Sequence, residues 1–408
     1  MKLKKKQLER DATGPLKGLR VIDLTRFVAG NMLTHQLADY GADVIKVEPL
    51  EGDPFRLWKT NGQSIWWQIY SRNKRSVAID FRNTKSTELL RNLIATADVL
   101  VESFRAGVLE AMGLAPATLL EQNPKLVITR ISGWGQDSLY KHKPGFGTLV
   151  EGYSGFAAIN GFEDRPPVLP PLFLGDMSTG IYGAFATLAA VMNVRNGTGR
   201  GQVIDLALLD PVLAMLGPQA AAYHMTGKLK RRTGSLSSTT CPRNVYKTAD
   251  DRWIAMSAAK QSIVERLFKI MGREDMIGDP RFATNATRLE HVELVDCAVA
   301  DYVRTKTLKE VLEIFEQNSI TAGPVNDASM LLDDEFIADK ESLILFGEDS
   351  EEIPMHNVSS RMSETPGNLH RYAPAVGEHT EEILGQILEQ EVIQAYLAEG
   401  VISGVKQA

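Results

Sequence analysis

Strand-like and helix-like segments alternate along the first third of this 408-residue chain. Residues 19–24 and 43–48 are short segments rich in Val, Ile and Leu, which predicts strands. Between them, apolar side chains at helical spacing run over residues 32–40 and end near Gly41. Two strand-like segments joined by an amphipathic helix are typical of a β-α-β unit, which connects two parallel strands. This pattern predicts a parallel sheet covered by helices.

The same alternation continues further along the chain. A predicted helix at residues 84–97 is followed by a predicted strand at 99–102. Two more such pairs follow: a helix at 115–122 with a strand at 125–131, and a helix at 179–196 with a strand at 202–206. Five or more such strands are enough for a single α/β sheet with helices on both faces. We therefore expect an α/β fold.

The alternation breaks at residues 226–242, a basic and then Ser/Thr-rich stretch without periodicity, where we place a domain boundary. Beyond it, strand-like runs at residues 244–248 and 253–257 predict a hairpin, and several helices follow. The predicted domains are a first part of the large domain at 1–225, a small α+β domain at 226–339, and a return to the large domain at 340–408.

Charge and cysteine content exclude several classes of protein. The chain has 45 Lys and Arg against 51 Asp and Glu, which gives a net charge of −6. It therefore lacks the excess of positive charge that is typical of nucleic-acid-binding proteins. Its two cysteines, Cys241 and Cys297, lie far apart in sequence, which favours a reducing compartment over a disulfide scaffold. We expect a cytoplasmic protein that acts on small molecules.

Neither a membrane span nor a secretory signal is expected. A spanning helix needs about 20 predominantly apolar residues, and the best candidate, residues 181–194, is shorter. The basic residues 1–7 lead into acidic residues and not into an apolar segment, so they do not resemble a secretory signal. We expect these residues to form a solvated tail.

Common nucleotide and hydrolase motifs are missing from the sequence. The turn after the first predicted strand, residues 25–31, lacks the glycine fingerprint of dinucleotide-binding folds. The chain also has no phosphate-binding loop, no zinc-binding His-Glu-x-x-His helix and no Gly-x-Ser-x-Gly nucleophile elbow. These absences argue against nicotinamide-dependent, kinase, metalloprotease and α/β-hydrolase chemistry.

Asp176 is of interest because it follows a proline-rich loop, residues 167–173, and stands at the start of a long apolar helix. One interpretation is that Asp176 or Ser178 caps this helix by accepting hydrogen bonds from unpaired amides. A second is that Asp176, kept ionised by the positive end of the helix dipole, is a carboxylate nucleophile. The two interpretations share one geometry, and the residues alone leave both open.

Several sequence blocks resemble family III CoA-transferases, the CaiB/BaiF group, and follow the family's order from about residue 15 to about 385. The blocks are residues 16–25, 37–48, 73–76, 102–107, 175–176, 199–202, 279–282 and 377–380. The resemblance implies a Rossmann-like large domain made from both chain ends and a small domain inserted between them. It also implies two ring-like subunits interlocked as a homodimer.

The resemblance implies an activity as well. Such enzymes move CoA from an acyl-CoA donor to a small mono- or dicarboxylic acid through covalent intermediates on the aspartate of the Gly-Asp motif, here Asp176. A carboxylate suits this role, because an anhydride keeps the acyl group activated where a serine ester would not. The expected partners are acyl-CoA and carboxylate substrates, with no metal and no cofactor beyond the CoA thioesters themselves.

By their position in the family blocks, Lys74, Arg75 and Arg105 are predicted to bind the phosphates of CoA. The turn around Val28 and Ala29 is placed near the thioester. Arg26, in the same turn, is a candidate partner for the carboxylate of the acceptor acid.

Two alternatives remain on the same fold. In α-methylacyl-CoA racemases a histidine works with the Gly-Asp aspartate to move a proton, but here Phe146 stands at that position and cannot transfer one. Gly147 replaces an acidic residue common in the family, which leaves open whether Glu151 supplies a carboxylate instead. The second alternative is a non-catalytic CoA-binding protein. Residues 234–240 are a candidate for the loop that covers the active site.

Overall fold

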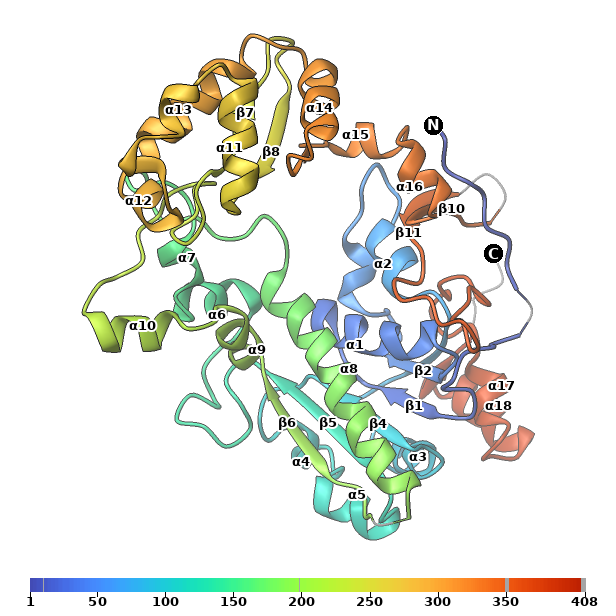
Figure 1. The fold of residues 1–408 in the computed structure, drawn as a ribbon. Coiled ribbons are helices and arrows are strands. Elements are labelled where there is room, and N and C mark those ends of the chain that lie inside the picture. The colour runs from blue at the N-terminus through green and yellow to red at the C-terminus, as the bar shows by residue number, and fades with distance from the viewer. Residues whose placement is uncertain (10, 198, 349–351, 405–408) are drawn as a thin grey trace. The chain divides into compact units, whose positions relative to one another are not determined.

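The computed structural model describes residues 1–9, 11–197, 199–348 and 352–404 (Figure 1). The chain forms two compact units, each built from segments distant in sequence. The first comprises Met1–Phe156, Leu169–Gly217 and Leu332–Ala408, and the second comprises Ala157–Val168 and Pro218–Leu331. Both ends of the chain therefore belong to the same unit.

Within the described residues, a seven-stranded sheet forms the centre of the first unit (Figure 1). Its strands, in spatial order, are β12 (Ile402–Ser403), β3 (Lys74–Ile79), β2 (Asp43–Glu48), β1 (Arg20–Asp23), β4 (Val99–Glu102), β5 (Val127–Ser132) and β6 (Val203–Ala207). The short strand β12 pairs antiparallel with β3, and all other neighbours are parallel. The predicted α/β fold with a mainly parallel sheet is confirmed.

Helices cover both faces of this sheet. Because side chains alternate between the two faces of a strand, neighbouring residues of β1 enter different cores. Val21 packs with α1 (Phe27–Asp39) and α8 (Leu174–Arg195) on one face. On the other face Ile22 packs in a second core, whose helices are α3 (Lys85–Ala95), α5 (Pro116–Gln122), α17 (Thr380–Leu384) and α18 (Gln390–Ala398).

The strand order creates a crevice at one edge of the sheet. From β1 the chain proceeds through α1 to β2 and β3 on one side, whereas β4, β5 and β6 lie on the other side. At such a reversal, the connections that leave the carboxyl ends of adjacent strands diverge and open a crevice, which is where open α/β sheets bind ligands. The carboxyl ends of β1 and β4 are therefore the place to look for a site.

The N-terminal residues are ordered along a peripheral strand, contrary to the prediction of a solvated tail. Lys5 forms a parallel bridge with Leu345 of β10 (Leu343–Phe346), and the side chain of Leu3 is buried. β10 pairs antiparallel with β11 (Ile353–His356). The other elements of the first unit are η1 (Pro54–Leu57), α2 (Ile65–Tyr70), α4 (Val108–Ala111), α6 (Gly147–Tyr153), α9 (Leu209–Met215) and α16 (Glu335–Asp339).

The second unit contains a small antiparallel sheet of β7 (Arg243–Lys247), β8 (Trp253–Ser257) and β9 (Ala322–Pro324). Helix α7 (Phe156–Ile159) begins at the last residue of the first unit and continues into the second. The other helices of the second unit are α10 (Gln219–Thr226), α11 (Gln261–Ile270), η2 (Glu274–Met276), η3 (Pro280–Phe282), α12 (Asn285–Glu290), α13 (Val292–Val303), α14 (Leu308–Gln317) and α15 (Ala328–Leu331). Tyr246 and Ile254 of the β7–β8 hairpin pack against Phe315 of α14 in its core.

The unit boundaries differ from the sequence-based domains, which placed them after residues 225 and 339. The structure divides after Gly217 and Leu331, because α10 belongs to the second unit and α16 to the first, the reverse of what was expected. Residues 157–168 also join the second unit. There Arg232 donates hydrogen bonds to the carbonyls of Phe162 and Arg165, a long-range pairing that no local pattern predicts.

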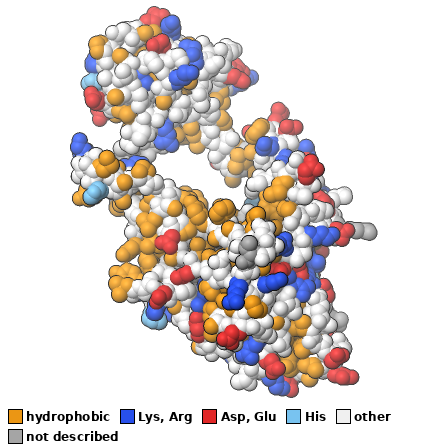
Figure 2. Space-filling model, turned by 60° about the horizontal axis from the view of Figure 1, so that its bottom comes forward, with side chains coloured by type: hydrophobic (Ala, Val, Ile, Leu, Met, Phe, Trp, Pro, Cys, Tyr) orange, Lys and Arg blue, Asp and Glu red, His pale blue; other side chains and the backbone are white. Residues whose placement is uncertain are grey.

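Helix α8 is long and apolar, and by length and composition alone it could cross a membrane. One of its faces is packed inside the unit, where Gly180 lies against Met32 and Gly183 against Leu33. The opposite face is exposed, with apolar side chains at Ile181, Phe185 and Met192. Apolar side chains also gather on the molecular face shown in Figure 2.

Candidate active site

A cavity of about 580 Å³ opens where the carboxyl ends of β1, β4 and β5 meet. The backbone amide of Arg26, after β1, donates a hydrogen bond of 3.0 Å to the hydroxyl of Ser103, after β4. This bond ties together the two loops on either side of the strand-order reversal. Residues that line the cavity include Arg26, Phe27, Ala29, Phe81, Ser103, Phe104, Arg105, Ser132, Gly133, Trp134, Lys141, Lys143, Phe146 and Asp176.

Asp176 is the one carboxylate among the described residues that line the cavity. It is the third residue of α8, and the backbone amides of Ala29 in α1 and of Asp176 itself favour the ionised form of its carboxylate. Burial and the nearby negative charge of Glu151 raise the pKa of Asp176 to about 6, against the opposing effect of the two amides. The group is thus ionised at neutral pH but more basic than an ordinary aspartate.

Two residues of α6 shape the surroundings of Asp176. Glu151 is buried, and its Oε1 accepts a 3.0 Å hydrogen bond from the amide of Gly175. One turn earlier, a Cβ atom added at Gly147 would lie only 2.3 Å from Oδ2 of Asp176. Glycine at position 147 therefore leaves room for the Asp176 carboxylate. The sequence analysis left open whether Glu151 supplies a carboxylate in place of the acidic residue that Gly147 replaces, and here Glu151 is the negative charge near Asp176.

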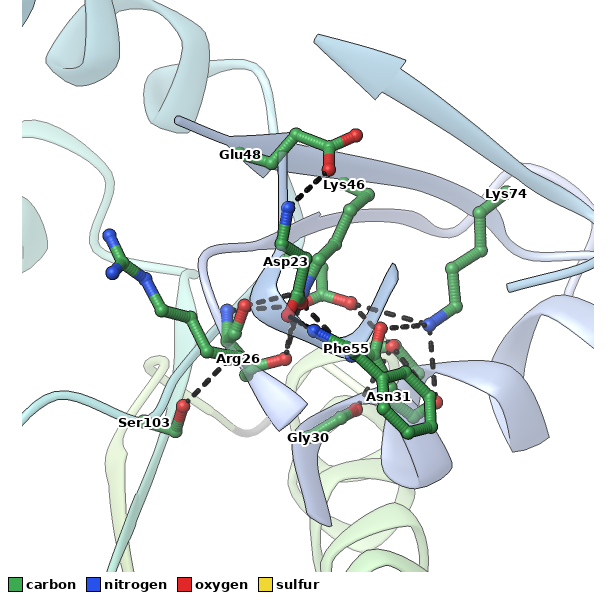
Figure 3. Close-up of polar contacts among 12 residues, drawn as sticks. Asp23, Arg26, Gly30, Asn31, Lys46, Glu48, Phe55, Lys74 and Ser103 are labelled. Atoms are coloured by element: carbon green, nitrogen blue, oxygen red, sulfur yellow. Dashed lines mark hydrogen bonds and ion pairs between the residues drawn. The ribbon is translucent and has the colours of Figure 1, made fainter. Parts of the chain in front are cut away.

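The turn that carries Ala29 rests on a buried cluster of charged groups (Figure 3). Lys46 of β2 lies 3.3 Å from Oδ1 of Asp23 and 3.0 Å from Oδ2 of Asp53, and it also donates to the carbonyl of Thr25. Lys74 of β3 donates to the backbone and side-chain oxygens of Asn31 at 3.1 and 3.0 Å. All four charged side chains are buried.

Electrostatics within this cluster favour its charged forms. Burial alone would raise the pKa of Asp23, but Lys46 and Lys74 lower it to about 2. Burial is the larger influence on Lys74 and lowers its pKa to about 8. Charges buried this deeply are stable only when paired and hydrogen-bonded, as they are here.

The cluster holds a strained turn in place. Phe27 has φ = 61°, in the left-handed region that residues with a Cβ rarely adopt. Its amide donates to Oδ1 of Asp53 at 3.2 Å, and its carbonyl accepts from the side chain of Asn31 at 2.5 Å. Two residues later comes the Ala29 amide that binds Asp176, so the buried charges set the position of this donor relative to the carboxylate.

Comparison with known proteins gives a consistent result. A family model described as CoA-transferase family III matches residues 16–380. The chain belongs to CoA-transferase family III. It is 37% identical to the succinyl-CoA–D-citramalate CoA-transferase of Chloroflexus aurantiacus, over 92% of this chain and 94% of that protein. It is 34% identical to the succinate–glutarate CoA-transferase of Agrobacterium fabrum, over 91% of this chain and 96% of that protein.

A solved structure agrees with this assignment. The fold is similar to that of a CAIB/BAIF family protein from Brucella suis, with a TM-score of 0.80 and 30% sequence identity, over 92% of this chain and 99% of that chain. The resemblance inferred from the sequence blocks is thus confirmed at the level of the family, and the protein is a family III CoA-transferase.

Four of the residues predicted for this CoA-transferase's site lie at the cavity: Asp176, Ala29, Arg26 and Arg105. Val28 does not line it and is buried in an apolar cluster with Phe55 and Trp67. Its neighbour Ala29, not Val28, provides the contact with Asp176.

The placement of Lys74 and Arg75 does not support a role in CoA binding. Both lie in β3, and neither lines the cavity. Lys74 is fully buried in the charged cluster, and the guanidinium of Arg75 is paired with Asp43 and Glu382 at 2.6 and 2.7 Å. Their charges are neutralised inside the protein, so they are not available for phosphates.

Sequence reasoning also missed residues that line the cavity. Phe104 and Ser103 follow β4, and Gly133 and Trp134 follow β5. Their place directly after predicted parallel strands was a usable signal, because those strand ends meet at one edge of the sheet. The cavity also contains Phe146, at the position of the racemase histidine. Residues 234–240 belong to the second unit, and their role as a lid stays a prediction.

Proposed function

We propose that this family III CoA-transferase transfers CoA from an acyl-CoA to a small carboxylic acid with Asp176 as nucleophile. The observation that carries the proposal is the placement of Asp176. It is a partly buried carboxylate with a pKa near 6, in a cavity at the carboxyl ends of the strands, with an amide donor beside it. Such a group is ionised at neutral pH and more nucleophilic than a solvated aspartate.

The first half of the reaction loads CoA onto the enzyme. A carboxylate oxygen of Asp176 attacks the thioester carbon of the donor, forming a C–O bond and breaking the C–S bond, so a mixed anhydride forms and CoA leaves as a thiolate. The thiolate then attacks the Asp176 carbonyl carbon of the anhydride. The donor acid leaves as a carboxylate, and CoA remains as a thioester of Asp176.

The second half runs the same steps with the acceptor. The acceptor carboxylate attacks the aspartyl thioester and releases CoA thiolate, which then attacks the acceptor carbonyl of the new anhydride. Acyl-CoA leaves and the Asp176 carboxylate is regenerated. No proton is gained or lost overall, so the site needs a carboxylate and hydrogen-bond donors but no general base. The Ala29 amide is such a donor.

Succinyl-CoA and small dicarboxylic acids are the proposed substrates. The similar proteins named above are transferases for succinyl-CoA with D-citramalate and for succinate with glutarate. The cavity fits anionic substrates, because four cationic side chains line it, at Arg26, Arg105, Lys141 and Lys143. We also propose that the enzyme is cytoplasmic.

The racemase alternative is disfavoured by the residues around Asp176. Moving an α-proton requires a titratable partner within reach of the substrate. Phe146 lines the cavity where that partner is expected, and its ring cannot accept a proton. A non-catalytic CoA-binding protein would have no need for a partly buried carboxylate whose pKa is raised at the cavity wall.

Mass spectrometry of the intact protein tests the proposal. After incubation with succinyl-CoA, we expect an added mass of CoA less one water, as for a thioester, on the peptide that contains Asp176, and no adduct in the Asp176→Asn variant. An adduct that persists in Asp176→Asn would assign the nucleophile elsewhere. Exchange of solvent deuterium into the α-position of a branched acyl-CoA, without an adduct, would instead establish a racemase.

A further inference from the structure

The four cationic side chains of the cavity differ in their surroundings. Arg105 and Lys143 are exposed, and Lys143 lies over the ring of Tyr140. Lys141 is half-buried and lies 3.5 Å from the carboxylate of Asp137. Exposed cations of this kind suit the strongly hydrated phosphates of CoA, whose charge is expensive to bury.

Arg26 differs from the other three because, among the described residues, it alone of these cations is half-buried without a carboxylate partner, whereas the half-buried Lys141 lies beside Asp137. It is half-buried, and its guanidinium lies 5.8 Å from the ring centre of Phe81 and 5.9 Å from that of Phe104. Figure 3 shows this guanidinium directed away from the buried cluster of Lys46 and Lys74. Among the described residues no carboxylate forms an ion pair with it, whereas the other half-buried or buried arginines of the sheet, such as Arg75 and Arg130, are paired.

The position of Arg26 is close to the reacting end of the substrate. Arg26 immediately precedes α1, and the amide of Ala29, in the first turn of that helix, stabilises the ionised carboxylate of Asp176, which also lines the cavity with Arg26 and Ala29. Three residues of an α-helix rise only about 4.5 Å along the axis. The side chain of Arg26 therefore starts within one helical turn of the donor that contacts the nucleophile.

From these observations we propose that Arg26, with Phe81 and Phe104, forms a subsite for the second carboxylate of a dicarboxylic acid. Phe81 and Phe104 supply apolar walls, which exclude water and strengthen a bidentate pair between guanidinium and carboxylate. A half-buried guanidinium without a carboxylate partner has lost part of its hydration, and an anionic ligand that pairs with it would stabilise its charge. This inference rests on the proposed function, since it concerns the acyl group that Asp176 receives.

One subsite serves both halves of the reaction. The succinyl group of the donor and the dicarboxylic acceptor each present one carboxyl to Asp176 and one to Arg26, and they occupy the site in turn. Arg26 therefore selects dicarboxylates over monocarboxylates at both stages. Arg105 instead contributes to binding the CoA portion, which all the thioesters share.

The test compares thioesters that differ only in the second carboxylate. We expect Arg26→Gln to lower kcat/KM for succinyl-CoA by about 10- to 100-fold, the usual range for losing one charged hydrogen-bonded pair. Its kcat/KM for butyryl-CoA should stay unchanged, and Arg26→Lys should restore part of the preference. The matched control Arg105→Gln should raise KM for both thioesters alike.

The outcomes separate this subsite from the proposed function. Equal losses for succinyl-CoA and butyryl-CoA in Arg26→Gln, or no loss for either, would overturn the subsite while leaving the transferase intact. Calorimetric titration with glutarate and with pentanoate measures the same subsite without turnover. Glutarate binding that depends on Arg26 in a protein that forms no CoA adduct would support the subsite and refute the transferase. Glutarate binding that is unaffected by Arg26→Gln, with no adduct, would refute both.

Discussion

At the scale of single residues, the ionisation of Asp176 links the structure to a measurable pH dependence. Its pKa is about 6, so the carboxylate becomes protonated, and loses its nucleophilicity, as the pH falls through that value. Glu151 is one cause of the raised pKa, and the Oε1 of a glutamine at 151 can still accept the Gly175 amide hydrogen bond.

We expect the acid limb of the kcat/KM profile to lie near pH 6 in the wild type. In Glu151→Gln it should move to lower pH, because removing the negative charge makes the ionised form of Asp176 less costly. The profile of initial rates between pH 4.5 and 8 measures this. The surface variant Glu88→Gln on α3 should leave the limb in place, and a limb that does not move in Glu151→Gln would contradict the assignment.

Gly147 offers a second test at this scale, because its hydrogen faces the nucleophile directly. A Cβ at this position would lie 2.3 Å from Oδ2 of Asp176, and the other two nearest atoms also belong to Asp176. Gly147→Ala should therefore displace the carboxylate without disturbing the rest of the packing. We expect kcat to fall by about 100-fold, as for a displacement near 1 Å, in a protein that remains folded.

Gly152 on the same helix provides a matched control, since nothing lies within 4 Å of a Cβ added there. Gly152→Ala should keep full activity, and thermal unfolding should show both variants folded, with stability changes within about 1 kcal/mol. Full activity in Gly147→Ala would show that the carboxylate has another productive position.

At the scale of secondary-structure elements, the sequence predicted the sheet well and the starts of two helices poorly. The strands β2 and β4 match the predicted ranges, because both are rich in Val, Ile and Leu, which favour strands. Helices α1 and α8 each begin five residues earlier than predicted. Their first turns contain glycine and polar residues such as Gly30, Asn31 and Gly175, which are poor helix formers and hide the periodicity.

The first turns of α1 and α8, which the sequence did not predict, contain residues of the candidate active site. Ala29 in α1 and Asp176 in α8 contact one another there, and small residues allow the close approach. The strand β3 was missed for a different reason. Lys74 and Arg75 make it look like a surface segment, yet their charges are matched inside the protein by residues distant in sequence, such as Asp23 and Glu382. Pairing of that kind is a property of the fold and cannot be derived from local sequence.

At the scale of the whole molecule, the exposed stripe on α8 requires an explanation. Ile181, Phe185 and Met192 lie on one side of the helix, with exposed fractions of 54%, 75% and 61%. Monomeric proteins rarely expose apolar side chains over a continuous area. The inner face of α8 is closely packed against α1, so this helix is anchored in the protein. We propose that a second copy of the chain covers the stripe, as expected from the interlocked homodimer of the resembling family.

Light scattering in solution tests this proposal. We expect the wild type to have the mass of a dimer and Phe185→Glu to shift toward monomer, because a charge buried in an apolar interface costs several kcal/mol. Leu139→Glu is the matched control, since Leu139 is 94% exposed and lies off the stripe, and it should stay dimeric. A monomeric wild type, or a Phe185→Glu variant that stays dimeric, would contradict the proposal. If the subunits interlock, tagged and untagged dimers should exchange partners only slowly, because separation requires partial unfolding.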